Sequence, residues 1–440
     1  MAENGKYGAV AHEEAPSFIS HVLSSMDNKV RKQPLLHRDT MPSAHEHSEL
    51  HVFESHRKET WYELFYDLIF VAIAIQLSHI VQYDISVMAL FKAGVIFSVM
   101  RTTWDELMFY QNRFDTKDFL HFTFYLFQAL CAFVMAEHLS VDHETGSWDA
   151  SANVGPIAVA AVLSRLANAF MYSQLCATAT RYHRHILAIA VAQVVTAFMY
   201  LVSAVAPYDK QYFYWYWLVA ILCERYVVWF YVCFFLGEDT EMIRVPWHFG
   251  HLIHREGTFV LLILGETIIQ MVQNQVGTGS IDYVRGLLGF SCVFNMGNLY
   301  RQQQLVGEKY FKECKTETPS YAWISLHLFL SMAMLFFAAG VKLVYASAHS
   351  DVSFERIEQE IYLMSVSACG ALVIMYILRL QYHGITERGT WGQIGGIAVD
   401  YSYRYYSYLF RFFISFACIS IPSITHNSTT SGKYSIIQVL

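Results

Sequence analysis

Long apolar stretches separated by short polar connections dominate the chain from Trp61 onward. A helix needs roughly 20 residues to cross the hydrocarbon core of a bilayer, and inside lipid only helices or closed barrels satisfy their backbone hydrogen bonds. The pattern therefore predicts an all-α fold, a polytopic bundle of about eleven transmembrane helices. We expect these spans, of which the eighth is short, near residues 61–81, 87–108, 119–139, 156–179, 186–206, 214–236, 257–274, 285–300, 321–346, 360–381 and 404–424.

Polar segments lie at both ends of this apolar region. Residues 1–58 are rich in His, Ser, Glu and Lys, and we expect a disordered polar tail there. The transmembrane domain then covers 59–424, and a short tail covers 425–440. Lys and Arg gather in alternate connections, for example near 301–315, whereas the opposite side carries an acidic loop near 142–149. The positive-inside rule then predicts a cytoplasmic N-terminus and leaves the host membrane open.

Composition agrees with an integral membrane protein. The 440 residues are 55% hydrophobic and only 15% charged, whereas soluble domains have about 25% charged residues. The net charge of -7 comes without a basic block, so nucleic-acid binding is not expected. None of the 8 cysteines forms a C-x-x-C pair, which favours buried thiols over a disulfide or zinc framework.

The first span carries carboxylates that need an explanation. Thr60 and Glu63 fit a capping box, with Thr60 as the N-cap and Glu63 at the third helical position. Asp67 lies one turn deeper, and the cap does not account for it. An acid within a membrane span is costly, so we expect Asp67 to face the bundle interior, with Gln76 further along the same helix.

The seventh span repeats this arrangement. At helical spacing Arg255, Glu266, Gln270 and Gln273 fall on one face, which we expect to point away from lipid. Glu266 lies near the middle of the span, and Gly265 beside it would allow a close backbone approach. For Asp67 and Glu266 we favour a functional role over a purely structural one.

Other spans carry charges at mid-depth, namely Arg165 in the fourth and the adjacent Glu224 and Arg225 in the sixth. Two interpretations stay open. Arg165 and Arg225 form structural salt bridges with Glu224 and Glu266, or these groups belong to a proton or ion path.

Two further groups lie in or near the ninth span. His327 is either a satisfied core donor or a group that exchanges protons. Lys342, near the outer end, is expected to snorkel toward the interface.

Metal binding and enzymatic activity are not expected. His248, His251 and His254 recur before the seventh span but lack a compact zinc motif such as H-E-x-x-H. No nucleophile elbow, P-loop or Rossmann signature is present, so we predict no enzyme, no metal and no cofactor. The candidate pathway residues are Glu63, Asp67, Gln76, Arg165, Glu224, Arg225, Arg255, Glu266, Gln270 and His327.

A weak internal similarity suggests duplication. Each of the first and seventh spans has an acid, an apolar run and a glutamine, Gln76 and Gln270. The helices that follow them end in related sequences, at 110–113 and 298–301. Many transporters are built from such repeats.

Two motifs resemble one family. ELFYDLIFVAIAIQLSH, from Glu63 to His79, resembles the first-helix signature of the bacterial low-temperature-requirement protein A (LtrA) family. HREGTFVLLILGETII, from His254 to Ile269, resembles its second signature, in which R-x-G is followed by L-G-E. QNRFDTKD at 111–118 and the stretch 327–342 are also similar, so the resemblance runs from Trp61 to the last span.

The resemblance implies a polytopic helical membrane protein. It marks as signature positions Glu63, Asp67, Gln76, Arg255, Gly257, Gly265 and Glu266. The family pattern usually has an acid where this chain has His254, so a role for that acid is not carried over. The long polar N-terminal tail is an addition to the bacterial pattern.

These observations predict a transporter or channel. In this hypothesis Asp67 and Glu266 line a polar pathway for a small ion or proton, and Arg165 and Arg225 are counter-charges. The alternative is a membrane scaffold or a sensor of stress or cold, whose intramembrane charges are structural. The lipid bilayer is the one partner that the sequence predicts, and oligomeric state and substrate stay open.

Overall fold

A computed structural model describes residues 59–114, 118–141, 148–178, 182–205, 212–235, 245, 247–273, 279–313, 318–347 and 353–386. These residues form ten helices and no strand, which confirms the predicted all-α class. The helices are α2 (Trp61–Tyr83), α3 (Val87–Arg113), α4 (Phe119–Glu137), α5 (Ala150–Thr178), α6 (His183–Val205), α7 (Phe213–Phe235), α8 (Phe249–Gln273), α9 (Ser280–Glu313), α10 (Thr318–Ser347) and α11 (Phe354–Thr386).

The ten helices correspond to the first ten predicted spans. By length and composition, seven helices in the described part are apolar enough to cross a membrane, namely α2, α3, α4, α5, α6, α10 and α11. Helix α9 has 34 residues and extends well beyond the short span expected at 285–300. The eleventh span at 404–424 and both tails lie outside the described residues. The chain is therefore multi-pass, while eleven spans and an internal repeat stay predictions.

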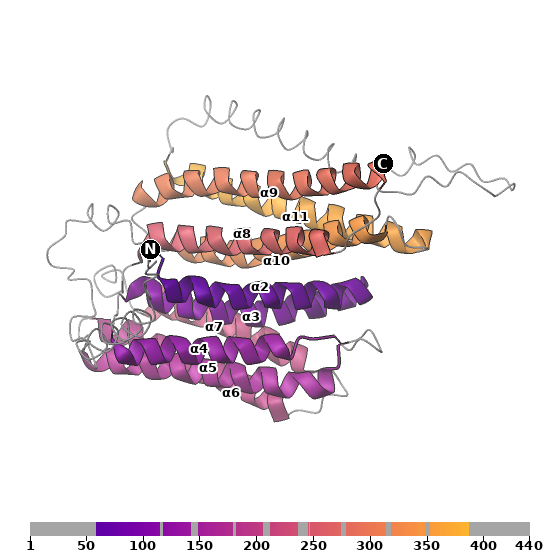
Figure 1. Cartoon of the computed structure of the whole chain (residues 1–440). Helices are drawn as coiled ribbons and strands as arrows, with labels where there is room; N and C mark the ends of the chain where they lie inside the picture. The colour runs from indigo at the N-terminus through magenta and orange to yellow at the C-terminus, as the bar shows by residue number, and fades with distance from the viewer. Residues whose placement is uncertain are drawn as a thin grey trace, which may run out of the picture.

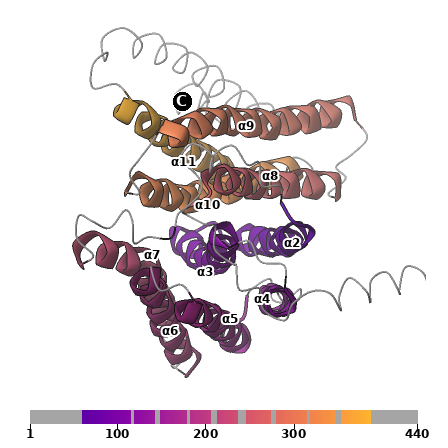
Figure 2. The ribbon, with the colours of Figure 1, turned by 90° about the vertical axis from the view of Figure 1, so that its left-hand side faces the viewer.

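The helices lie side by side in layers, with α2 and α3 in the middle (Figures 1 and 2). Helices α4 to α7 lie on one side of this pair and α8 to α11 on the other. Helix α2 packs against α4, α8 and α10, and α3 packs against α5, α7, α8 and α10. The α2–α3 pair therefore connects the two groups, and charges on it reach partners in both.

Of the two central helices, α3 is more completely surrounded by other helices. Every residue from Val99 to Arg113 is buried, including Arg101, Asp105 and Glu106. A helix that is buried all round must be surrounded by other helices. Its charged side chains consequently lie in the protein interior, although the sequence around them is that of an apolar span.

Local signals explain where the central helices begin. The capping box of Thr60 and Glu63 is present at the start of α2, as the sequence predicts. Ser86 accepts a hydrogen bond from the Ala89 backbone N–H and caps α3, and Asp118 caps α4 in the same way. The caps satisfy backbone donors that the first helical turn leaves without partners.

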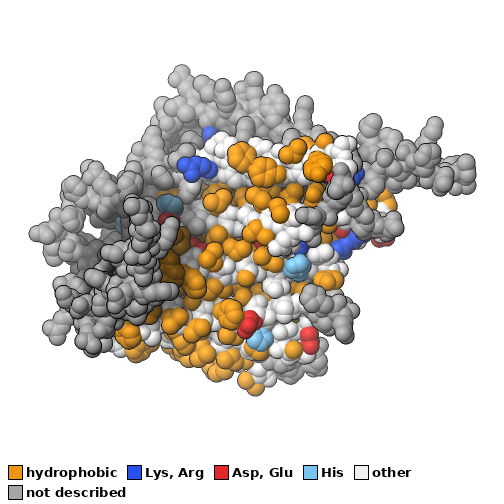
Figure 3. Space-filling model, viewed as in Figure 1, with side chains coloured by type: hydrophobic (Ala, Val, Ile, Leu, Met, Phe, Trp, Pro, Cys, Tyr) orange, Lys and Arg blue, Asp and Glu red, His pale blue; other side chains and the backbone are white. Residues whose placement is uncertain are grey.

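Many apolar side chains lie on the face of the bundle that Figure 3 shows. Helix α4 exposes Leu126, Leu130 and Phe133, and α9 exposes Leu287 and Phe294. So large an apolar surface is expected to face lipid rather than water. Five described cysteines are free thiols; Cys131 and Cys292 are buried as the sequence predicts, whereas Cys369 is exposed.

Candidate functional site

Asp67 on α2 is held by groups from two neighbouring helices. Arg255 of α8 binds its carboxylate through both terminal nitrogens, at 2.5 Å from Nη1 to Oδ2 and 2.8 Å from Nη2 to Oδ1. The indole Nε1 of Trp104 on α3 donates to Oδ1 at 2.8 Å. All three side chains are buried. Asp67 therefore joins α2, α3 and α8 in a closed, bidentate ion pair of the strong kind.

Glu63 lies one turn closer to the helix start and also faces α8. Its Oε2 accepts from the Thr60 backbone N–H at 2.6 Å, and its Oε1 lies 3.3 Å from Nε2 of His251. His254 contacts Glu59 at 2.8 Å near the surface. The histidines thus bind separate carboxylates, and the described residues contain no metal-binding group of three or more ligands.

A second chain of charges runs through α3. Arg101 contacts Glu256 of α8 at 2.5 Å and Asp105, one turn along its own helix, at 2.6 Å. Asp105 also pairs with Arg225 of α7. The Arg101 guanidinium lies over the Trp104 ring, 4.3 Å from its centroid. Because Trp104 also donates to Asp67, its ring lies between the two clusters.

Arg165 of α5 binds Glu224 of α7 on the other side of α3. The Nε–Oε1 distance is 2.6 Å, and the Nη2–Oε2 distance is 3.1 Å. Thr103 and Thr102 accept further hydrogen bonds from the same guanidinium, at 2.8 Å and 3.1 Å. The pairing of Arg165 with Glu224 agrees with one of the two sequence interpretations.

A small polar cavity lies beside this pair. It has a volume of about 40 Å³, and its lining includes Glu106, Arg113, Gln193, Glu224 and Arg225. Gln193 Nε2 donates to Glu106 Oε2 at 2.7 Å. One water needs at least ~10–15 Å³ and several polar partners, so this cavity suits ordered water.

Within the described residues no short ion pair holds Glu266, unlike Asp67, Glu224 and Glu256. It is buried on α8, yet its Oε1 has no hydrogen-bond partner in the described structure. The ammonium of Lys342 on α10 attracts it electrostatically, and Lys342 Nζ is likewise buried without a hydrogen-bond partner. Helices α8 and α10 pack directly against each other. The two groups form a buried pair that no hydrogen bond closes.

This arrangement corrects four expectations from the sequence. Arg225 pairs with Asp105 rather than Glu266, because α3 supplies its counter-charge. Lys342 does not snorkel, since only 2% of the residue is exposed. Gly265 does not bring another backbone close, because a Cβ placed there meets nothing within 4 Å. Of the polar face predicted on α8, Arg255, Glu266 and Gln270 are buried, whereas Gln273 is exposed.

The remaining candidates, His327 and Gln76, form no salt bridge within the described part of the chain. His327 on α10 is buried and contacts the Tyr300 hydroxyl of α9 at 3.2 Å and the Trp323 carbonyl at 2.9 Å. It thus has partners on both ring nitrogens. Gln76 on α2 is partly buried, toward the far end of the helix from Asp67.

Sequence reasoning missed Arg101, Asp105, Glu106 and Glu256. The signal was present in R-T-T-W-D-E, which places Arg101 and Asp105 four residues apart inside an otherwise apolar span. Such i,i+4 spacing brings opposite charges together on one helix face. Charges of that kind in a spanning helix mark an interior position, by the same argument that was applied to Asp67.

The apolar helices and the buried ion pairs define a multi-pass membrane protein. A search of curated proteins and of solved structures finds no significant match to the chain. The model of the bacterial low temperature requirement A protein (LtrA) family matches residues 58–429, which is most of the chain. The chain belongs to this family, as its first- and seventh-span motifs indicate. The matched region contains every candidate residue named above.

Proposed function

We propose that the protein transports a small cation or protons across the membrane, and that Glu266 and Lys342 are its exchanging groups. The observation that carries this proposal is the arrangement of Glu266 and Lys342, called the open pair because no hydrogen bond joins them. Both side chains are buried between α8 and α10, and each has a polar atom without a hydrogen-bond partner in the described structure. An ionisable group deep in a membrane protein is a functional candidate by default.

The chemistry of the pair supports proton exchange. A carboxylate and an amine can each gain or lose a proton, whereas a guanidinium stays charged in proteins. Three other buried carboxylates, Asp67, Glu224 and Glu256, face arginines. Glu266 faces lysine instead, so this pair alone among these four can become neutral by passing a proton across. The neutral pair would then be free to separate when α8 and α10 move.

A flux assay tests this proposal. Full-length protein is reconstituted in liposomes containing a pH dye, and proton flux is driven by a potassium gradient with valinomycin. We expect flux in wild type and its loss in Glu266→Gln. The double variant Glu266→Gln/Lys342→Met removes both charges, so it should remain folded and still lack flux. Flux in the double variant equal to that in wild type would overturn the assignment.

Glu360→Gln is the matched control. Glu360 on α11 is also buried, but it is paired with Arg356 of its own helix at 3.2 Å. Its loss removes a buried carboxylate outside the Glu266–Lys342 pair. Flux should therefore persist in Glu360→Gln at the wild-type level after correction for the amount of reconstituted protein.

The second candidate function is a membrane scaffold or sensor. The closed pairs of Asp67, Glu224 and Glu256 favour it, since they join five helices through arginine and leave little freedom to titrate. This candidate predicts no flux in wild type, and loss of stability rather than activity in the variants. Measuring flux and thermal unfolding on the same preparations separates the two functions.

A further inference from the structure

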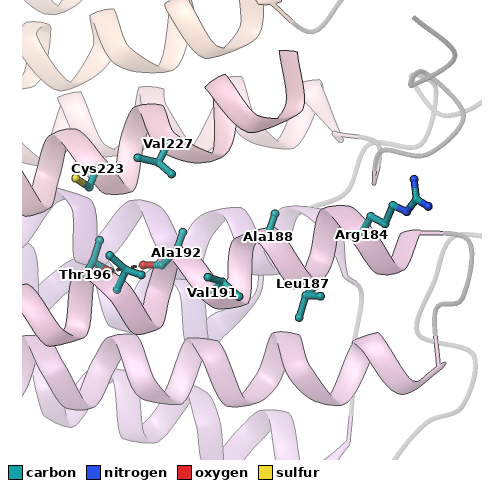
Figure 4. Close-up of a pocket in the computed structure, with 9 residues that line it drawn as sticks. Arg184, Leu187, Ala188, Val191, Ala192, Thr196, Cys223 and Val227 are labelled. Carbon is teal, nitrogen blue, oxygen red and sulfur yellow. Dashed lines mark hydrogen bonds between the residues drawn. The ribbon is translucent and has the colours of Figure 1, made fainter. Parts of the chain in front are cut away.

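An apolar groove lies on the outside of the bundle between α6 and α7 (Figure 4). Its volume is about 330 Å³, within the range of small-ligand sites. On α6 the lining residues recur every three or four positions and so form one continuous stripe. The lining comprises Arg184, Leu187, Ala188, Val191, Ala192, Val195 and Thr196 from α6, and Cys223 and Val227 from α7.

The groove opens to the surroundings rather than into the protein. Val191 and Val227 on its walls are 53% and 52% exposed. Ala192 in its floor is buried, and small alanines at 188 and 192 leave room between the larger side chains. Thr196 donates its hydroxyl to the Ala192 carbonyl at 3.0 Å, so its polar group is satisfied within the helix. The surface offered to a ligand is therefore hydrocarbon.

The length of the groove matches one leaflet of a bilayer. Arg184 and Thr196 lie at opposite ends of its α6 side in Figure 4, about 18 Å apart at ~1.5 Å per residue. Half of a ~30 Å hydrocarbon core is about 15 Å. Because α6 begins at His183, Arg184 lies at the end of the span and Thr196 lies near its middle. A groove of this length extends from the interface to the bilayer centre.

Arg184 is the one charged residue of the lining. It is exposed at the interfacial end, where phospholipid phosphates lie. A guanidinium is suited to phosphate because it donates several hydrogen bonds in a planar fork. We propose that this groove binds one acyl chain of an anionic phospholipid, with Arg184 contacting the headgroup phosphate. The site requires only that the chain lie in a bilayer, and it does not depend on the proposed transport.

Native mass spectrometry of the full-length protein tests the site. Delipidated protein is titrated with phosphatidylglycerol, with phosphatidylcholine and with inorganic phosphate. We expect one saturable phosphatidylglycerol adduct, with affinity about fivefold above phosphatidylcholine, as one arginine near an anionic surface contributes. Inorganic phosphate should not compete, because it lacks the acyl chain. Equal affinity for the two lipids, or displacement by phosphate, would overturn the proposal.

Two pairs of variants separate the chain from the headgroup. Val191→Trp fills the groove and should weaken binding of both lipids by about tenfold. Val194→Trp is the matched control, since Val194 is exposed on α6 outside the groove. Arg184→Gln should abolish the preference for phosphatidylglycerol while phosphatidylcholine still binds. The exposed Arg301 on α9 supplies its control, Arg301→Gln, which should keep the preference.

The variants also distinguish a lipid from a second copy of the chain as the occupant of the groove. If a second copy of the chain occupies the groove, Val191→Trp changes the mass of the assembly. If lipid does not bind in the groove, Val191→Trp and Val194→Trp change lipid affinity equally. Either result would overturn the lipid site. A specific loss in Val191→Trp, with the mass of the assembly unchanged, supports it.

Discussion

Two regions of α8 each contain a buried acid–base pair, but only one of the two pairs is joined by hydrogen bonds. Near its start, Arg255 binds Asp67 through two short contacts, and Trp104 completes the carboxylate's partners. Further along the helix, Glu266 and Lys342 attract each other without a hydrogen bond. Both regions are buried and both involve opposite charges. They differ in whether the geometry closes the pair and in whether the cation can lose its charge.

That difference separates stability from function. Moving ions out of water is costly, and a pair recovers this cost only with good geometry and additional hydrogen bonds. The Asp67 pair meets this condition and joins α2, α3 and α8. The Glu266 pair does not meet it, so it contributes little to holding the helices together. A costly arrangement without a structural benefit is easier to explain by function.

The largest effect is expected from opening the closed pair. Asp67→Asn leaves the Arg255 guanidinium buried, charged and without its carboxylate. Breaking one partner of a buried pair costs about 3–5 kcal/mol, so we expect a marked fall in the stability of the protein in detergent. Thermal unfolding followed by intrinsic fluorescence measures the change, because Trp104 lies in the cluster.

The double variant Asp67→Asn/Arg255→Met checks the cause. It removes both charges, and well-packed neutral replacements of buried pairs are often no less stable. Stability should therefore recover relative to Asp67→Asn alone. If Asp67→Asn unfolds at the wild-type temperature, the Asp67–Arg255 pair does not stabilise the helix bundle as its geometry indicates.

A smaller effect is expected where α10 packs on α11. A Cβ at Gly340 would lie 2.7 Å from Met364 Cα, which is backbone and cannot turn aside. Gly340→Ala should therefore force the helices apart and destabilise by about 1–3 kcal/mol. Gly340 is two residues from Lys342 in α10. This variant therefore also tests whether the position of Lys342 depends on the close contact between α10 and α11.

Gly265→Ala is the matched control for Gly340→Ala. A Cβ at Gly265 meets nothing within 4 Å, although Glu266 is the next residue. Alanine is favoured over glycine in a helix interior by up to about 1 kcal/mol, so this variant should unfold at the wild-type temperature or slightly above it. Equal destabilisation by the two variants would contradict the packing difference between these glycines.

The sequence predicted those features that depend on one helix at a time. Apolar length predicted the helices, the capping box predicted the start of α2, and the cost of a buried acid predicted that Asp67 faces inward. Each of these follows from the residues of a single helix. The burial of Asp67, Ala74 and Ser78 on one face of α2 agrees with that expectation.

The Arg165–Glu224 pair agrees with one of the sequence interpretations. The other partners of the charges could not be predicted, because they depend on which helices are neighbours. On charge alone Glu266 is one candidate partner for Arg225, yet α3 lies against α7 and supplies Asp105. Lys342 was placed at the interface by its position in the span, yet α8 lies beside it and supplies Glu266. Helix order and rotation are set by packing over the whole bundle, which no local pattern contains.

A smaller loss than that of Gly340→Ala is expected for the Glu266–Lys342 pair, and it provides the sharpest test of the comparison. Glu266→Gln removes a carboxylate that makes no hydrogen bond through Oε1, and Lys342 can then release its proton, as Arg255 cannot. We expect a loss of about 1 kcal/mol or less, measured by the same thermal unfolding as Asp67→Asn. If Glu266→Gln lowers stability as much as Asp67→Asn does, the Glu266–Lys342 pair holds the helices together. That result would favour the scaffold function over transport.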